Sequence, residues 1–165
     1  MSKIVKVNYR DVKRRQSRTL RDRTDKFSKA RDDASKLRDR NCCALIAVTV
    51  ITGKSYEDVF DMFAARGRRR GHGTQTWTTH AVLRDCGFTL ERMKRLPKTV
   101  NQCEQKLSKT KVFLIHTSCH VLAMRAGEVH DHSRGSKRIP KDIYRVIRKR
   151  KKSVADVAEW AYDQA

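Results

Sequence analysis

The stretch CCALIAVTVI, residues 42–51, is a nearly continuous apolar run and decides where the core of the fold begins. The composition changes abruptly just before it, at Asn41. A buried helix and a buried strand both fit a run of this length, because periodicity does not separate them. We therefore predict a first core element here and leave its conformation open.

Helices are predicted in the part of the chain that follows. Ser55, with Asp58 three residues later, has the pattern of a capping box. Apolar residues then recur at helical spacing, at Tyr56, Val59, Phe60 and Phe63. Gly67 marks the expected end of this helix. Thr74 or Thr76 is expected to cap a second helix that ends at Gly87, and a shorter helix is expected over residues 100–107.

The second half of the chain has the pattern of strands. We predict them at residues 111–116, 120–125, 128–131 and 143–147, with a tight turn at Ala126 and Gly127. A weakly alternating edge strand in residues 1–9 and a C-terminal helix over residues 153–162 are also expected. Helices first and an antiparallel sheet after them predict an α+β domain.

The first forty residues differ from the rest. They contain 15 Lys and Arg against 6 Asp, few large apolar residues and no Gly or Pro. Residues 10–40 are typical of a solvated helix or of a segment that orders on an anionic partner. We therefore divide the chain into a basic N-terminal segment, residues 1–40, and a domain, residues 41–165.

The whole chain is strongly basic: 39 Lys and Arg against 18 Asp and Glu give a net charge of +21. Such a field attracts nucleic acid or another polyanion. The expected binding residues are Arg14, Arg15, Arg66, Arg68, Arg69, Arg70, Arg148, Lys149, Arg150, Lys151 and Lys152. No apolar run has the ~20 residues of a membrane span, and residues 1–10 lack the apolar stretch that is typical of a signal peptide. A cytosolic location, or one inside a particle assembled there, is expected.

The cysteines and histidines define the candidate chemistry. Five cysteines without a Cys-x-x-Cys pair predict neither a disulfide framework nor a zinc site. Cys42 and Cys43 open the apolar run, and the predicted hairpin places Asp131 near His120, where a carboxylate can orient an imidazole. The other histidines and Cys119 alternate between faces, so no metal or other cofactor is predicted.

Two segments resemble a known family. Residues 41–74, NCCALIAVTVITGKSYEDVFDMFAARGRRRGHGT, and the later CHVLAMRAGEVHDH are similar to small phage-encoded papain-like cysteine peptidase domains related to bacteriocin-processing peptidases. The resemblance covers residues 41–147 and implies a papain-like fold. It assigns the nucleophile to Cys43 rather than Cys42, the imidazole to His120 and the orienting carboxylate to Asp131. Asn41 is the nearest side-chain amide for an oxyanion hole, beside the backbone N–H of Cys43.

Two functions follow from these observations. One is a thiol hydrolase, most simply a cysteine peptidase acting on a protein or peptide, with a basic surface that binds polyanions. The alternative is a catalytically inactive peptidase fold that binds nucleic acid or a partner associated with nucleic acid. A phage source, which the resemblance implies, makes a virion or host-takeover role natural for that alternative.

Overall fold

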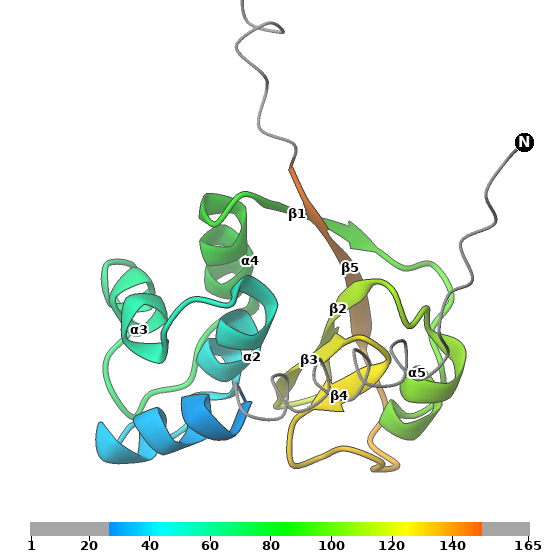
Figure 1. Cartoon of the computed structure of the whole chain (residues 1–165), viewed down its shortest axis with the longest axis horizontal. Helices are drawn as coiled ribbons and strands as arrows, with labels where there is room; N and C mark the ends of the chain where they lie inside the picture. Colours follow the sequence, from blue (N-terminus) through cyan, green and yellow to red (C-terminus); the bar gives the residue numbers. More distant parts are fainter. Residues whose placement is uncertain (1–26, 150–165) are drawn as a thin grey trace, which may run out of the picture.

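The apolar run forms a helix, α2 (Cys43–Thr52), in the computed structural model, which describes residues 27–149. Every residue from Ala44 to Ile51 is buried. A helix that is apolar on all sides needs neighbours on all sides, and α2 has them in α3, α4 and the sheet (Figure 1). This central position settles the choice between helix and strand that the sequence left open.

The helices after α2 largely match the predictions. They are α3 (Tyr56–Ala64), α4 (Thr76–Asp85) and the short α5 (Val100–Lys106). The Ser55 side chain accepts a hydrogen bond from the backbone N–H of Asp58, which confirms the predicted cap of α3. The cap of α4 was predicted wrongly: Gln75 occupies it and makes no side-chain capping bond.

A five-stranded antiparallel sheet forms the second half, in the order β1-β5-β2-β3-β4. The strands are β1 (Phe88–Arg92), β2 (Val112–His116), β3 (Val121–Arg125), β4 (Glu128–His130) and β5 (Asp142–Arg148). β1 was not predicted, because it is a polar edge strand with no fully buried residue. Ala126 and Gly127 both have positive φ in the two-residue turn between β3 and β4, as the favoured hairpin turns require.

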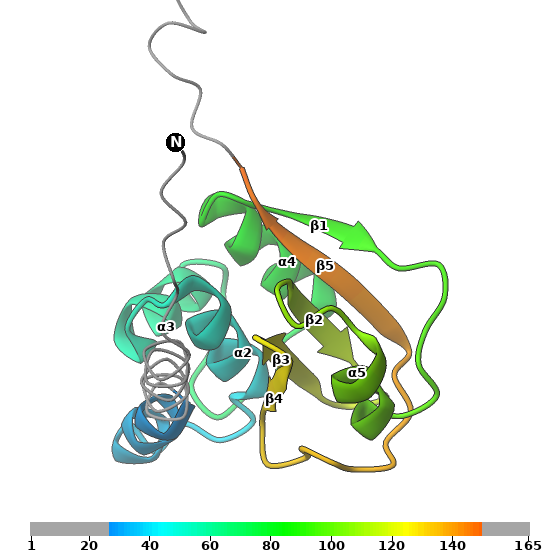
Figure 2. The same cartoon turned by 45° about the vertical axis from the view of Figure 1, so that its right-hand side comes forward.

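The molecule has three layers, with the sheet in the middle. Helices α2, α3 and α4 cover one face and α5 lies on the other (Figures 1 and 2). Alternate residues of β2 point to opposite faces. Leu114 belongs to the cluster around α2, whereas Phe113 and Ile115 pack in a second cluster with Val100 of α5. The predicted α+β class with an antiparallel sheet is therefore confirmed, but the helices do not all precede the sheet, because α5 lies between β1 and β2 in the chain.

Part of the predicted N-terminal segment belongs to the core. Residues 27–36 are helical, and Ala30 and Ala34 are buried in the cluster around α2. Its small alanine side chains therefore pack in the same core cluster as the residues of α2 and α3. The predicted edge strand in residues 1–9 and the C-terminal helix over residues 153–162 lie outside the described residues. Among residues 27–149, no helix is both long enough and apolar enough to span a membrane.

Candidate active site

Three elements bring the predicted catalytic residues together. Cys43 is the first residue of α2, His120 directly precedes β3, and Asp131 directly follows β4. The β2–β3 loop is closed by a hydrogen bond from the backbone N–H of Thr117 to the carbonyl of His120, 2.8 Å long. Because β3 pairs with β4 and packs against α2, the hairpin places one strand end beside the helix N-terminus.

His120 and Asp131 form a hydrogen-bonded ion pair. The Nε2 atom of His120 lies 2.9 Å from Oδ2 of Asp131. The same oxygen also accepts hydrogen bonds from the backbone N–H of Ser133, at 2.8 Å, and from its hydroxyl. With three donors on one oxygen, the carboxylate is held in a single orientation. Burial favours its neutral form, but these hydrogen bonds outweigh burial and lower the pKa of Asp131 to about 2.

The thiol of Cys43 lies close enough to the imidazole of His120 for each group to shift the pKa of the other. Asp131 occupies Nε2, which leaves Nδ1 of His120 for the sulfur. The hydrogen bonds from Asp131 and Cys43 raise the pKa of His120 to about 9. Burial alone would raise the pKa of Cys43, but the hydrogen bonds from His120 and from the backbone of Val121 lower it below 9.0. Both shifts favour a thiolate beside an imidazolium.

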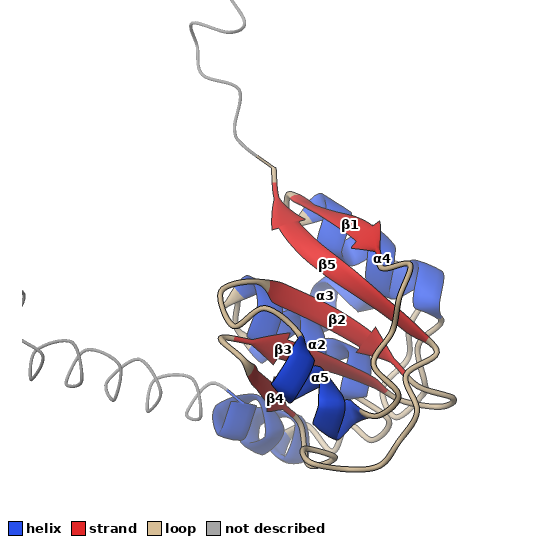
Figure 3. Cartoon of the chain, turned by 90° about the vertical axis from the view of Figure 1, so that its right-hand side faces the viewer, coloured by secondary structure: helices blue, strands red, loops and turns tan. Residues whose placement is uncertain are grey.

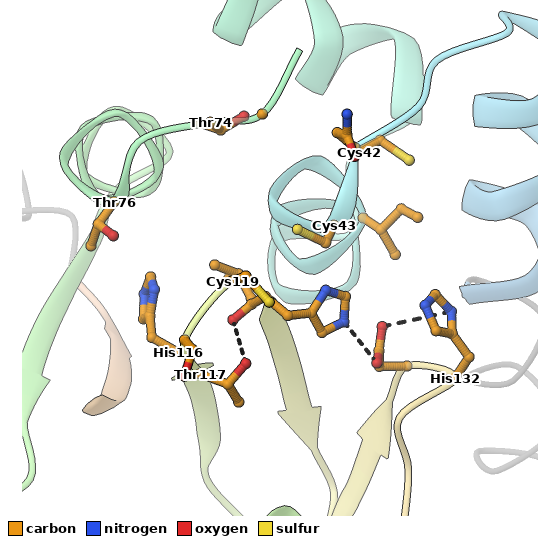
Figure 4. A pocket seen from close by; sticks show the side chains of 15 residues that line it. Cys42, Cys43, Thr74, Thr76, His116, Thr117, Cys119 and His132 are labelled. Carbon is orange, nitrogen blue, oxygen red and sulfur yellow. Dashed lines mark hydrogen bonds and ion pairs between the residues drawn. The ribbon is translucent and has the colours of Figure 1, made fainter. Parts of the chain in front are cut away.

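Cys42 lies in a different environment, although it is the next residue. It caps α2, and its side chain points away from that of Cys43 (Figure 4). Burial raises the pKa of the Cys42 thiol, and the negative charge of Asp39 adds to this effect. The side-chain directions and the opposite pKa shifts therefore distinguish the two cysteines: of the two, only Cys43 has its pKa lowered by His120.

A buried ion pair holds the chain on the far side of Cys42. The side chains of Arg68 and Asp39 are 2% and 0% exposed, with Nη1 of Arg68 2.9 Å from Oδ2 of Asp39. Asp39 also accepts hydrogen bonds from Tyr56 and from the backbone N–H of Gly71, both 2.7 Å long. This network ties the segment before α2 to the loop after α3. The assignment of Arg68 to the polyanion-binding surface was therefore wrong, because its charge is buried and paired.

A cavity of about 520 Å³ opens in front of Cys43, between the N-terminal ends of α2 and α4 and the β2–β3 loop. Figure 4 shows Thr76 and His116 on the side opposite His132. His116 is buried and belongs to the cavity wall. Burial, together with the neighbouring His80, lowers the pKa of His116 to about 4, so its ring is neutral at pH 7. The cavity therefore has the charged pair of His120 and Asp131 at one end and the neutral ring of His116 at the other.

Asn41 lies at the rim of this cavity, but its amide is already bonded. Its Nδ2 atom donates to the carbonyl oxygen of Gly71 at 3.0 Å. Asn41 also has a positive φ of 55°, a conformation that asparagine tolerates better than most residues. The backbone N–H of Cys43, in the first turn of α2, has no partner within the helix, and Cys43 lines the cavity. The backbone of Cys43 is therefore the better oxyanion donor of the two.

One group of side chains among residues 27–149 has the spacing of metal ligands. Ligand atoms of His120, Asp131 and His132 lie within 4.8 Å of one another. The expectation that alternation separates the histidines was wrong for His132, because it lies beyond the end of β4. A metal ion here would compete with the bond between His120 and Asp131, so the donor set fits the catalytic pair better.

The other predicted polyanion-binding residues are distributed unevenly. Arg69, Arg70, Arg148 and Lys149 are exposed. Arg66 is half-buried, paired with Asp85 and bonded to the carbonyl of Met62. The remaining ones, Arg14, Arg15, Arg150, Lys151 and Lys152, lie outside the described residues.

Sequence reasoning missed the residues that position the catalytic groups. Ser133 follows Asp131 at the spacing at which a serine side chain turns back to a carboxylate, and this Asp-x-Ser pattern was the available signal. Nothing in the sequence indicated that Asp39 and Arg68, 29 residues apart, would pair. The chain matches no protein-family model, no curated protein and no solved structure.

Proposed function

We propose that this chain is a papain-like thiol hydrolase, most simply a cysteine peptidase, with a basic surface that binds polyanions. The observation that carries the proposal is the contact of Cys43, at a helix N-terminus, with an imidazole whose second nitrogen is bonded to a buried carboxylate. Nucleophile, base and orienting group in this order are the parts that thiol-based acyl transfer needs.

The proposed reaction uses these groups in two steps. The thiolate of Cys43 attacks the substrate carbonyl carbon, and the backbone N–H of Cys43 stabilises the oxyanion. The imidazolium of His120 then gives its proton to the leaving amine, which departs and leaves a thioester on Cys43. A water molecule attacks the thioester, with neutral His120 accepting its proton. The carboxylic acid is released, and the proton taken from water leaves His120 as an imidazolium beside the regenerated thiolate of Cys43.

The test is the pH dependence of alkylation of each cysteine by iodoacetamide, followed by mass spectrometry. The pH of half-maximal rate reports the thiol pKa and does not depend on accessibility. We expect this pH to lie below 9.0 for Cys43. It should lie above 9.0 for Cys86 and near 11 for Cys103, because burial raises both pKa values.

Variants sharpen the test. His120→Ala should raise the pH of half-maximal alkylation of Cys43, because burial raises the pKa of this thiol and the imidazole that lowers it would be absent. Cys42→Ala is the matched control and should leave the midpoint unchanged. Hydrolysis of a fluorogenic peptide library should be lost in Cys43→Ala and in His120→Ala. A Cys43 midpoint at or above 9.0 contradicts the proposal and favours the inactive, nucleic-acid-binding alternative.

The polyanion-binding part of the proposal rests on charge. The net charge of +21 is far from neutral for a chain of 165 residues, and Arg69, Arg70, Arg148 and Lys149 are exposed on the described part of the surface. Binding to phosphates releases condensed counterions, so affinity for nucleic acid should fall steeply as salt rises. Cys43→Ala should bind as the unaltered protein does.

A further inference from the structure

Helix α5 covers only part of its face of the sheet. It has seven residues and packs near β4. Figure 3 shows this face toward the viewer, with α5 in front of β3 and β4 and no helix of residues 27–149 in front of β1 and β5. An uncovered sheet face with large apolar side chains would be a hydrophobic patch, so the residues that occupy this one are informative.

A cavity of about 420 Å³ lies on this uncovered face. Phe113 of β2 pairs in register with Arg145 of β5, and Arg145 pairs with Glu91 of β1. These side chains therefore form one row across three strands. Lys111 and Met93 lie two residues from Phe113 and Glu91, on the same face by alternation. Half-buried Met93 supplies apolar surface, Phe113 is buried beneath it at the bottom of the cavity, and charged groups surround them.

The cavity has an excess of positive charge. Its walls carry five cationic side chains, those of Arg92, Lys94, Arg95, Lys111 and Arg145, against the single carboxylate of Glu91. Arg145 pairs with Glu91 at 2.7 Å, and the Nε of Arg92 donates to Asp142 at 2.8 Å. Lys94, Arg95 and Lys111 are exposed and form no ion pair within residues 27–149. The Nε atom of Arg145 is buried without a hydrogen-bond partner in that range.

We propose that this basic pocket, defined by Lys94, Arg95, Lys111, Arg145 and Phe113, binds phosphodiester groups of a nucleic acid strand. Three uncompensated cations around one concavity can contact successive phosphates. The apolar floor suits the sugar or base of the same nucleotide better than it suits the carboxylates of an acidic peptide. The inference rests on the proposed polyanion binding and does not depend on the thiol chemistry.

The pocket is separate from the cavity at Cys43. Lys111 directly precedes β2 and His116 is its last residue, five residues on, which is about 16 Å along a strand. A strand held at the pocket would therefore leave the catalytic cavity open. In this arrangement the hydrolase would act while attached to nucleic acid.

The test compares two triple variants of the full chain with equal loss of charge. The pocket variant is Lys94→Gln, Arg95→Gln and Lys111→Gln. The control variant is Lys29→Gln, Lys54→Gln and Lys137→Gln, which removes three exposed charges elsewhere on the surface. Fluorescence anisotropy measures binding to a labelled mixed-sequence oligonucleotide between 0.05 and 0.5 M salt. Parallel titrations use single-stranded DNA, single-stranded RNA and duplex DNA.

The slope of log affinity against log salt should be less negative by about 2 in the pocket variant. Each lost phosphate contact on a single strand accounts for ~0.7 of this change, and three cations are removed. This corresponds to about 100-fold weaker binding at 0.1 M salt. The control should change the slope by less than ~0.5.

Three results would overturn the inference: equal losses in the two variants, no binding by the full chain at any salt, or displacement of the oligonucleotide by polyglutamate at equal charge concentration. The alkylation midpoint of Cys43, measured on the same variants, should not move. A failure of the pocket proposal is therefore distinguishable from a failure of the hydrolase proposal.

Discussion

Replacing Arg68 by serine should destabilise the protein far more than the same change at Arg69. The two arginines are neighbours in one basic loop, but Arg68 is buried against Asp39, whereas Arg69 is exposed. Arg68→Ser removes two of the donors to the Asp39 carboxylate and leaves it with those of Tyr56 and Gly71. Breaking a buried ion pair by removing one partner costs about 3–5 kcal/mol, a large part of the ~5–15 kcal/mol that stabilises an ordinary domain.

Urea denaturation followed by circular dichroism at pH 7 measures this difference. With a slope of ~2 kcal/mol per molar urea, the Arg68→Ser midpoint should fall by about 2 M. Arg69→Ser is the matched control, and its free energy of unfolding should change by less than ~0.5 kcal/mol. Equal midpoints for the two variants would show that the buried pair contributes no more than a surface charge, and the reasoning would fail.

The pH dependence provides a second check on the same pair. Burial favours the neutral carboxyl of Asp39, but the hydrogen bonds from Arg68, Gly71 and Tyr56 together lower its pKa below 3.8. In the unaltered protein, the stability contributed by Asp39 is therefore present above pH 3.8 and is lost as pH falls through the lower folded pKa. In Arg68→Ser, fewer hydrogen bonds oppose the effect of burial, so the pKa of Asp39 in the folded state rises. Protonation of Asp39 then removes the cost of a buried, poorly compensated charge. The difference in stability between the two proteins should narrow from pH 7 toward pH 4; a constant difference would contradict this account.

Two further predictions concern the hairpin that carries the catalytic pair. Ser133→Ala removes one donor to Asp131 but keeps the backbone N–H. The pKa of Cys43 should rise and alkylation at pH 7 should slow by up to about tenfold, equivalent to ~1.4 kcal/mol; a lower melting temperature with an unchanged Cys43 midpoint would indicate a purely structural role. Ala126→Asn should raise the free energy of unfolding by about 0.5–1 kcal/mol, because Ala126 has a φ of 56° in a turn that favours Asn-Gly. Thermal denaturation measures this gain, and any loss of stability would refute the turn assignment.

Local patterns predicted most of the elements. The capping box at Ser55, the helix over residues 100–107 and the turn at Ala126 and Gly127 all depend on residues within a few positions of one another. The same holds for the pairing of His120 with Asp131, since a two-residue turn fixes the register of the strands on either side. Elements without a local signal, such as the polar strand β1, were missed.

The sequence alone established the α+β class and the strong positive charge, and with the family resemblance it predicted Cys43, His120 and Asp131 as candidate site residues. Only the tertiary structure decided how these groups are used. It places Cys43 rather than Cys42 beside the imidazole of His120. It also shows that Arg68, which we expected at the surface, is buried and paired with Asp39. Local patterns report what a residue prefers within one or two turns of chain. Burial and ion pairing are set by segments distant in sequence, so the environment of a charged group is known only when those segments are packed together.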